Sequence, residues 1–396
     1  MAKWIECKIS DIGTVVGGAT PSTKKTENYE GGNIAWITPK DLSTFSGRYI
    51  KCGERNITEI GLKNSSTQLL PENTVLFSSR APIGYVAIAA NEVCTNQGFK
   101  SVIPNESTDP LFLFYLLKHN KDKIEAMGSG TTFKEVSGNT MKNIIVRVPS
   151  DKEVQKNIAS MLGTLDDKIE ENESINNNLL EQVLTLYRNR FIDTVNNKRR
   201  IFRADKYFDI SIGKTPPRKE PQWFSTNPQD IAWVSISDMG TCGLYISSSS
   251  EQLTREAVER HNVKIVPDNT ILLSFKLTVG RIAITNGEMT TNEAIAHFKT
   301  DKKEINEYLY CYLKCFNYQT MGSTSSIATA VNSKIIKGMP FVVPTDDELI
   351  DFHSVAAPMF AKIKANQTES KNLTAVRDIL LPKLMSGELD VSNIDF

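Results

Sequence analysis

The stretch "NIAWITPKDL" at residues 33–42 returns almost two hundred residues later as "DIAWVSISDM" at residues 230–239. Further matches keep the same order along the chain, and the longest sets "LPENTVLFSSRAPIGYVAI" (70–88) against "VPDNTILLSFKLTVGRIAI" (266–284). The offset between matched segments stays between 194 and 197 residues. Offsets of a duplicated chain drift in this way when the copies differ in loop length. The sequence is therefore an internal duplication.

The length and composition are those of a globular protein with more than one domain. A chain of 396 residues exceeds one ordinary hydrophobic core, and 40% hydrophobic and 23% charged residues are typical of folded proteins. No apolar run is long enough to cross a bilayer, and the start "MAKWIECKIS" lacks a basic-then-apolar signal region. Six scattered cysteines without a C-x-x-C pair are typical of reduced thiols. We therefore expect a cytoplasmic protein.

Each copy has the same anatomy. Short apolar runs broken by Gly, Asn and Pro predict strands and loops, with one helix-like segment among them. The segments "VPSDKE" (148–153) and "VPTDDE" (343–348) then open long helical tracts, because Pro before an acid-rich first turn is a typical helix start. The predicted class is α/β of the mixed α+β type. Its predicted parts are a lobe at 1–150, a helical tract at 151–196, a second lobe at 197–344, and a helical tract with a tail at 345–396.

The two helical tracts carry a coiled-coil pattern, with seam positions at alternating spacings of four and three. The predicted seam residues are Ile158, Leu162, Leu165, Ile169, Asn172 and Leu179 in the first tract and Met359, Ile363, Asn366 and Leu373 in the second. An Asn at the same step of both rows fixes register. Two like helices from two like lobes are expected to pair antiparallel, with the lobes related by a pseudo-twofold axis. The alternative is two independent amphipathic helices, each lying on its own lobe.

Net charge is zero, but its distribution is uneven. Residues 151–194 and 345–396 each hold 5 basic and 9 acidic side chains, so each tract carries −4. The remaining segments 1–150 and 195–344 are therefore positive, which suits contact with nucleic acid. A rod made of the two helices would act as a ruler along duplex DNA, whose grooves repeat every ~34 Å.

Linear motifs for catalysis or metal binding are absent from the sequence. There is no G-x-x-x-x-G-K-S/T phosphate loop and no H-E-x-x-H, and "TPPRK" (215–219) lacks the flanks of an adenine-methyltransferase turn. The four histidines form no metal spacing. Cys311 and Cys315 share a helix face, but no second ligand pair follows, so core positions are favoured over zinc. We expect no catalytic residue and no metal site in this chain.

The candidate DNA contacts are polar residues in loops that recur at matched positions. Arg80 and Lys276 follow a Ser at a strand end and suit a guanine edge or a phosphate. In "TNQG" (95–98) and "TNEA" (291–294), Asn and Gln can pair with adenine and Glu with cytosine. Solvated loop charges and turn caps are the alternatives. The complete candidate set is Lys40, Arg80, Asn96, Gln97, Thr131, Thr132, Lys134, Lys214, Arg218, Ser274, Lys276, Asn292, Ser325 and Ser326.

Two further segments have predicted roles that do not involve the bases. Trp36 and Trp233 are predicted to be core residues rather than stacking platforms. The basic segment "NNKRRIFR" (196–203) is predicted to be a solvated linker between the halves, with phosphate contact as the second reading.

Four features together carry a family resemblance: the twin G-x-T-P…A-W openings, the "GSGTT"-type loops, the P-S/T-D-x-E helix starts, and "LLPKLMSGELDV" at 380–391. Over essentially its whole length the chain resembles the specificity subunit of a type I restriction–modification system. The resemblance implies two target-recognition domains, each reading one half of a split double-stranded DNA site, with the helices setting the unread gap.

The resemblance also implies the partners. Two modification subunits dock on such a chain and methylate adenine at N6 with S-adenosylmethionine, and two restriction subunits can join for ATP- and Mg-dependent translocation and cleavage. The chain itself has no catalysis and holds no cofactor in this reading. The alternative from another class is a tandem-domain adaptor that binds proteins or glycans with its two lobes. A single-chain enzyme with a discontinuous site is less favoured.

Overall fold

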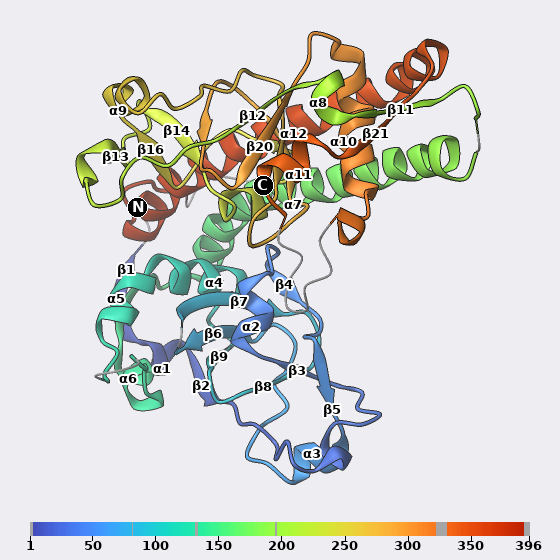
Figure 1. The fold of residues 1–396 in the computed structure, drawn as a ribbon. Helices are drawn as coiled ribbons and strands as arrows, with labels where there is room; N and C mark the ends of the chain where they lie inside the picture. The colour runs from blue at the N-terminus through green and yellow to red at the C-terminus, as the bar shows by residue number, and fades with distance from the viewer. Residues whose placement is uncertain (1–2, 81, 131–133, 195, 322–330, 392–396) are drawn as a thin grey trace. The chain divides into compact units, whose positions relative to one another are not determined.

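The computed structural model describes residues 3–80, 82–130, 134–194, 196–321 and 331–391. The chain divides into two compact units, which we call unit 1 (Met1–Glu171 with Ser370–Phe396) and unit 2 (Asn172–Glu369). Each unit combines small β-sheets with helices, so the mixed α/β class predicted from the sequence is confirmed (Figure 1).

Unit 1 is built on one large and two small sheets. Its strands are β1 (Trp4–Lys8), β2 (Gly13–Gly17), β3 (Ile34–Ile37), β4 (Tyr49–Ile50), β5 (Arg55–Ile57), β6 (Val75–Ser79), β7 (Ile83–Ala89), β8 (Cys94–Thr95), β9 (Lys100–Pro104) and β10 (Ile145–Pro149). Its short helices are α1 (Ile9–Ile12), α2 (Pro39–Ser43), α3 (Glu59–Lys63), α4 (Pro110–His119), α5 (Lys121–Ala126) and α6 (Gly138–Asn143). The sheet orders are β2-β9-β6-β7-β4, β5-β3-β8 and β1-β10.

Unit 2 repeats this plan. Its strands are β11 (Arg200–Arg203), β12 (Asp209–Ile212), β13 (Phe224–Ser225), β14 (Ile231–Val234), β15 (Tyr245–Ile246), β16 (Glu251–Leu253), β17 (Ile271–Ser274), β18 (Ile282–Thr285), β19 (Thr290–Thr291), β20 (Ile295–Lys299) and β21 (Pro340–Val343). Its short helices are α8 (Ala204–Tyr207), α9 (Arg255–Arg260), α10 (Asn306–Cys315) and α11 (Ser333–Lys337). The large sheet has the order β12-β20-β17-β18-β15, which matches that of unit 1 strand for strand. The duplication read from the sequence is therefore a duplication of the fold.

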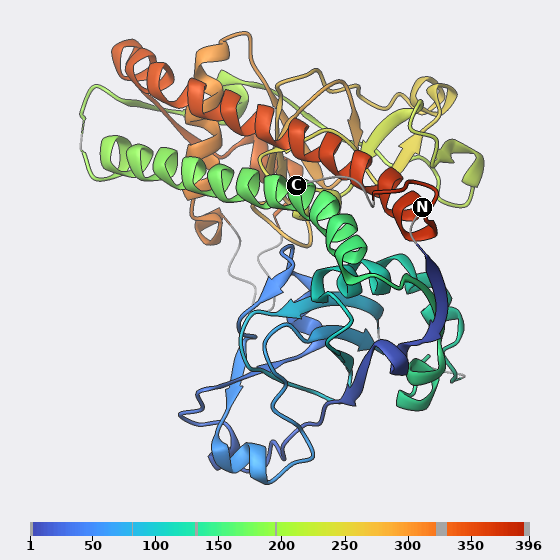
Figure 2. The same cartoon turned by 180° about the vertical axis from the view of Figure 1, so that it is seen from behind.

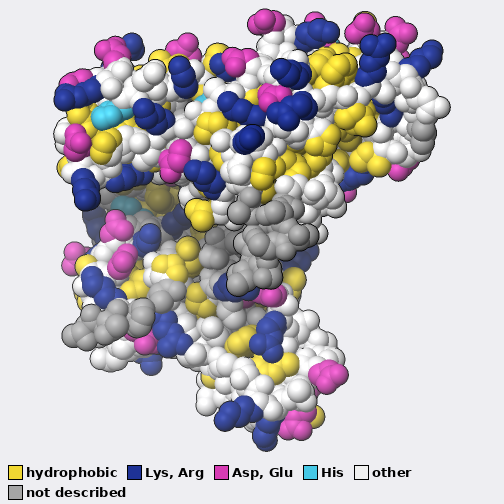
Figure 3. Space-filling model, in the orientation of Figure 1, with side chains coloured by type: hydrophobic (Ala, Val, Ile, Leu, Met, Phe, Trp, Pro, Cys, Tyr) yellow, Lys and Arg dark blue, Asp and Glu magenta, His cyan; other side chains and the backbone are white. Residues whose placement is uncertain are grey.

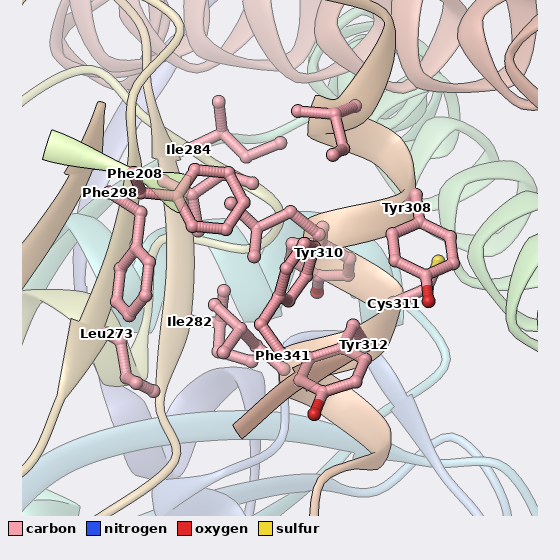
Figure 4. Close-up of a cluster of buried hydrophobic side chains, with 14 of the residues drawn as sticks. Phe208, Leu273, Ile282, Ile284, Phe298, Tyr308, Tyr310, Cys311, Tyr312 and Phe341 are labelled. Carbon is pink, nitrogen blue, oxygen red and sulfur yellow. The ribbon is translucent and has the colours of Figure 1, made fainter. Parts of the chain in front are cut away.

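The central strand of each large sheet is buried on both faces. Alternate side chains of a strand point to opposite sides, so its residues contribute to two different cores. In unit 2, Ile271 and Leu273 of β17 belong to a core closed by α10, while Leu272 belongs to a second core shared with the smaller sheet. Figure 4 shows the first of these cores, which contains Phe298 and Leu273 of the sheet and Tyr310 of α10. Continuous apolar runs such as "ILLS" are explained by this double burial.

The two long helices are α7 (Lys152–Tyr187) and α12 (Asp346–Ser386). In unit 2 the C-terminal part of α7 lies beside the N-terminal part of α12, and the two run in opposite directions (Figure 2). The Asn172 amide donates to Glu369 at 2.8 Å, and the Asn366 amide donates to Asn176 at 2.9 Å. In unit 1, Arg377 of α12 donates to Asp166 of α7 at 2.6 Å. The predicted antiparallel pairing is confirmed, and the alternative of two independent helices is not supported.

The seam residues divide by burial, because the helices pack on their lobes as well as on each other. Ile158 and Leu162 lie in the core of unit 1, and Ile363 lies in the core of unit 2. The buried seam residues are Ile158, Leu162, Asn172, Ile363 and Asn366, and the half-buried ones are Leu165, Ile169, Leu179, Met359 and Leu373.

The solvated linker predicted at 196–203 is corrected in two places: residues 200–203 form strand β11, and the side chain of Arg199 is buried. The Arg199 side chain is 8% exposed and donates to Glu348 of α12 at 2.8 Å and to the Phe191 carbonyl at 3.0 Å. A linker arginine becomes buried here because an acid at the helix start faces it. The sequence pattern had identified that acid as a helix-start residue only.

The Arg199–Glu348 pair makes a prediction about acid stability. Burial acts to raise the pKa of Glu348, but hydrogen bonds from Arg199, the Thr345 backbone and Asn196 outweigh it and lower the pKa from 4.5 to about 2. A carboxylate with a lowered folded-state pKa stabilises the fold above its unfolded-state pKa, and loses that contribution as pH falls towards its folded-state pKa. The stability difference between the wild type and Glu348→Gln is therefore expected to be full above about pH 5 and to shrink between pH 4.5 and about 2.

Urea unfolding of both proteins across this pH range, followed by hydrogen exchange of unit 2 peptides, measures that difference. Glu288→Gln, in an exposed turn of the same unit, is the matched control and is expected to follow the wild type. A wild type and a Glu348→Gln variant that lose stability in parallel as pH falls would contradict the linkage.

Candidate nucleic-acid interface

Each unit contains a set of hydrogen-bonded residues that we call the polar frame. In unit 1 it consists of Trp36, Asp41, Ser78 and Asn96, and in unit 2 of Trp233, Asp238, Ser274 and Asn292. Each member of one copy shares at least one equivalent hydrogen bond with its counterpart in the other copy. The frame therefore holds the same loops in the same way twice.

The tryptophans anchor the Gly-x-Thr-Pro loops. The Trp36 indole N–H donates to the Ala19 carbonyl at 3.1 Å, and the Trp233 indole N–H donates to the Lys214 carbonyl at 3.1 Å. The two indoles are 5% and 2% exposed. The core role predicted for both is confirmed, and each fixes the loop in front of it.

The aspartates of "TPKD" and "SISD" tie two loops together. The Asp41 carboxylate accepts from the backbone N–H groups of Thr38 at 2.7 Å and Glu54 at 2.8 Å. Asp238 makes both equivalent bonds, the first with Ser235 at 2.8 Å. Burial acts to raise the pKa of Asp238, but these hydrogen bonds outweigh it and lower that pKa. Both carboxylates accept backbone hydrogen bonds that tie loops together, so their role in the structure is to position those loops.

The asparagines cap the turns that follow β8 and β19. The Asn96 side-chain oxygen accepts from the Gly98 N–H at 2.8 Å, and that of Asn292 accepts from the Ala294 N–H at 3.0 Å. Both asparagines are half-buried. The turn-cap alternative considered for them is realised in both copies, and adenine contact by the same oxygens would compete with it.

The next residue in each turn points outward. Gln97 and Glu293 are exposed, and each accepts a hydrogen bond from a threonine of the Gly-x-Thr-Pro loop, Thr20 and Thr215 respectively. Burial acts to raise the pKa of Glu293, but the hydrogen bond from Thr215 and the charge of Lys276 help to lower it. The frame thus presents a neutral amide in unit 1 and a carboxylate in unit 2 at one equivalent position.

The serines hold the loops that follow β6 and β17. The Ser274 hydroxyl donates to the Thr278 carbonyl at 2.6 Å and accepts from the Arg281 N–H at 3.0 Å, and Ser78 makes the equivalent pair of bonds. Ser274 is 0% exposed, so it does not reach the surface where DNA would bind. The expectation of a direct DNA contact at Ser274 is therefore corrected. Its role in the structure is to position the loop that carries the exposed Lys276.

Among the predicted cations of unit 2, Arg218 is held by both hydrogen bonds and aromatic rings. Its guanidinium pairs with Glu251 through two bonds of 2.8 Å and lies over the rings of Phe224 and Trp233, 4.2 and 4.6 Å from their centroids. The hydrogen bond to Glu251 raises the pKa of Arg218 and lowers that of Glu251. This stacked arrangement fixes a positive charge beside the Gly-x-Thr-Pro loop.

The remaining predicted cations are placed as follows. Lys40 is exposed and pairs with Glu54 at 2.6 Å, and the Lys214 ammonium donates to the His261 carbonyl at 2.6 Å. Lys134 is exposed, and Arg80 is half-buried in a backbone bridge with Glu135. Four predicted residues, Thr131, Thr132, Ser325 and Ser326, lie outside the residues that the structure describes.

Several site residues were not in the set of DNA contacts predicted from the sequence. They are the frame residues Trp36, Asp41, Ser78, Trp233 and Asp238, and beside the frame Thr20, Thr215 and Glu293. The two threonines belong to the Gly-x-Thr-Pro match, but sequence alone gives no sign that they bond to turns more than seventy residues away. Glu293 faces Gln97 in the aligned repeat, and this substitution at a matched position was the available signal. In the structure this position lies beside the polar frame, where the side chain is exposed and receives a hydrogen bond from the Gly-x-Thr-Pro loop.

Charges are interspersed over the face seen in Figure 3, where Lys and Arg alternate with Asp and Glu on both units. Within the described ranges, no three His, Cys, Asp or Glu side chains gather as a metal would require. Cys311 is 0% exposed in the unit 2 core and Cys315 packs against that core, as predicted. None of the described helices is both long and apolar enough to span a bilayer.

Comparison with known proteins identifies relatives across the chain. A family model described as the type I restriction modification DNA specificity domain matches residues 1–181 and 201–353. The type I restriction enzyme MjaIX specificity subunit of Methanocaldococcus jannaschii is 35% identical over 422 aligned positions, covering 99% of this chain and 94% of that protein. The HindI specificity subunit of Haemophilus influenzae is 21% identical, covering 98% and 100%.

A solved structure shares the fold. The crystal structure of a type I restriction–modification S subunit from M. genitalium superimposes with a TM-score of 0.59 at 17% identity, covering 97% of this chain and 96% of that one. At this identity the likeness concerns the fold alone.

Proposed function

This chain belongs to the type I restriction–modification DNA specificity family, and we propose that its two units each read one half of a split duplex DNA site. The long helices set the unread gap between the halves and provide docking surface for the modification subunits. The chain supplies recognition, and the chemistry is carried out by its partners.

The observation that carries this proposal is the twin polar frame. Two sets of residues hold equivalent loops by equivalent hydrogen bonds, yet the frames present Gln97 in one unit and Glu293 in the other. Exposed residues on a constant frame are what two related readers of different sequences require, because base edges are distinguished by hydrogen-bond donors and acceptors. The tandem-adaptor alternative finds no support among the known relatives.

Partner docking is supported by a second repeated feature. The small sheets β1-β10 and β11-β21 expose apolar side chains at matched positions: Ile5 is 40% exposed in unit 1, and Ile201 is 69% exposed in unit 2. A single exposed apolar side chain is common on protein surfaces, so the support comes from its repetition at the same place in both units. Two equivalent surfaces suit two copies of one partner, in accord with two modification subunits per chain. Two restriction subunits complete the complex that we propose.

The chemistry of the proposed complex belongs to the partners. The modification subunits would transfer a methyl group from S-adenosylmethionine to adenine N6, and the restriction subunits would use ATP and Mg. This chain contributes no group to those steps. Its residues bind the duplex and position it.

The test is to co-express the chain with its host's modification subunits and to map methylated adenines by single-molecule sequencing of the host DNA. We expect a split motif with one modified adenine in each half, which disappears when this chain is deleted. A stable complex without any motif would contradict sequence reading by this chain, and the absence of a complex would favour an adaptor.

Arg80→Ala gives a finer prediction. Arg80 follows β6 in unit 1, so its loss is expected to weaken or relax one half-site only, by about 1–3 kcal/mol if it reads a guanine. The measurement is the methylation motif of the variant complex beside that of the wild type. Equal effects on both halves would show that Arg80 has a structural role instead.

A further inference from the structure

Gln97 and Glu293 differ in chemistry although equivalent hydrogen bonds hold them and their turns. Each follows a turn-capping asparagine and receives a hydrogen bond from a threonine whose loop is anchored by a buried tryptophan. The cap itself is made by Asn96 and Asn292, so the outward residue is not needed to form the turn. The identity of this residue is therefore free to serve another purpose.

The two side chains are held in place before any ligand arrives. The hydroxyls of Thr20 and Thr215 donate to Gln97 and Glu293, and both acceptors remain exposed. A side chain that is already ordered loses less conformational entropy on binding. An exposed side chain that binds no ligand gains little from being ordered, because water can make the same hydrogen bond to it.

The negative charge of the Glu293 carboxylate limits which groups of DNA can bind next to it. Its pKa is lowered in part by Thr215 and by the charges of Lys276 and Arg218, so it is ionised at neutral pH. On a surface that approaches DNA, a carboxylate is repelled by phosphate. The contact that favours it is a hydrogen-bond donor on a base edge, since an ionised carboxylate only accepts.

Base chemistry distinguishes the two residues further. In the major groove, cytosine presents the N4 amino donor, whereas adenine presents the N6 donor next to the N7 acceptor. The second oxygen of a carboxylate would face that N7 unfavourably, while a glutamine amide accepts from N6 and donates to N7. The carboxylate therefore fits cytosine, and the amide fits adenine.

We propose that Glu293 selects cytosine in the half-site read by unit 2, and that Gln97 selects adenine at the corresponding position of the half-site read by unit 1. The inference rests on the proposed function. It assigns two specificity-determining residues and the base that each one reads. Thr20 and Thr215 act as positioning residues in this scheme.

The test uses the full chain in its modification complex and compares methylation motifs of the wild type, Glu293→Gln and Gln97→Glu. We expect Glu293→Gln to change one position of one half-site from cytosine towards adenine, and Gln97→Glu to make the reverse change in the other half-site. The matched control is Glu288→Gln, which changes an exposed acid of unit 2 outside the frame and is expected to keep the wild-type motif. Motifs that stay unchanged in both site variants would overturn the inference.

A wild-type complex without a split motif would instead contradict the proposed function, so the two failures are distinguishable. If a variant no longer methylates, its complex is compared on oligonucleotide duplexes that carry cytosine or adenine at the position in question. We expect the preference for cytosine, on the order of tenfold or more in the wild type, to be lost or reversed in Glu293→Gln. A variant that keeps the wild-type ratio would overturn the assignment.

A double-mutant cycle isolates the contact itself. In the DNA, a 2-pyrimidinone nucleotide replaces the cytosine and so removes the N4 amino group. In the protein, Glu293→Ala removes the carboxylate. The wild-type complex is expected to lose on the order of tenfold in affinity on the analogue, and Glu293→Ala is expected to lose much less. Equal losses in both complexes would show that the carboxylate does not meet this base.

Discussion

Inserting four residues into α7 between Asn172 and Asn176, together with four into α12 between Asn366 and Glu369, is expected to lengthen the unread gap and to leave both half-sites unchanged. Four helical residues add about 6 Å, which corresponds to at most about two base pairs of duplex at ~3.4 Å each. Methylation at the original spacing is expected to be lost almost completely, because both half-sites can no longer be engaged at once.

The site of this insertion is chosen from the structure. It lies between two polar pairs of unit 2, Asn172 with Glu369 and Asn176 with Asn366, so that matched insertions preserve both pairs. A heptad seam accommodates an insertion of four residues by local unwinding. An insertion in one helix alone would separate one of the two pairs.

Single-molecule sequencing of the methylated motif measures the gap directly. The matched control inserts the same four residues at the exposed turn around Gly287, which connects β18 and β19 and is outside the long helices. That control is expected to keep the wild-type gap. If the helix insertions also left the gap unchanged in a folded, active complex, the helices would not be the ruler.

Arg48→Ala is expected to destabilise unit 1 by about 2–4 kcal/mol. Arg48 is 5% exposed, and its guanidinium donates to Glu170 at 3.0 Å and to Asp167 of α7, as well as to the Gly163 carbonyl at 3.3 Å. Burial acts to lower the pKa of Arg48, but its hydrogen bonds to the two carboxylates outweigh this and raise it. The side chain joins the lobe to the helix, and its removal leaves the acceptors without the guanidinium, while the backbone N–H of residue 48 can still donate to Glu170.

The expected loss stays below that of a fully buried pair for a physical reason. The side chains of Asp167 and Glu170 are 70% and 34% exposed, so water can solvate them once the arginine is gone. Urea unfolding, followed by hydrogen exchange of unit 1 peptides, measures the change. Lys156→Ala removes an exposed pair with Glu153 on the same helix and is the matched control, expected to cost less than about 1 kcal/mol. A similar cost for both variants would contradict the structural role of Arg48.

In unit 2 a neutral side chain makes the contact between the lobe and its long helix. There the Gln367 side chain of α12 accepts from the Tyr245 N–H at 2.9 Å and donates to the Cys242 carbonyl at 2.7 Å. In unit 1 the Arg48 N–H donates to Glu170 in the same way at 3.1 Å. Both lobes therefore meet a long helix through a backbone N–H and a side-chain oxygen, and unit 1 has in addition the ion pairs of Arg48.

The sequence by itself determined the features that depend on local residue patterns, namely the repeat and the secondary-structure periodicity. Repetition at a constant offset revealed the duplicated fold, and the four-and-three spacing revealed two helices that pair. Burial of Trp36 and Trp233 was predicted because a large aromatic side chain is more often in a core than on a surface. These predictions succeeded because periodicity and side-chain hydrophobicity decide which face of an element is buried, whatever the rest of the chain does.

Tertiary structure alone decided how polar side chains are used. Ser274 and Arg199 are polar residues of the kind that is usually exposed. In the structure Ser274 is buried beneath the loop that follows it, and Arg199 is paired with Glu348 at the start of α12. Asn96 and Asn292 cap turns, while their neighbours Gln97 and Glu293 project outward and are held by threonines from distant loops. A polar group takes its role from the partner that satisfies its hydrogen bonds, and here those partners are brought close only by the fold.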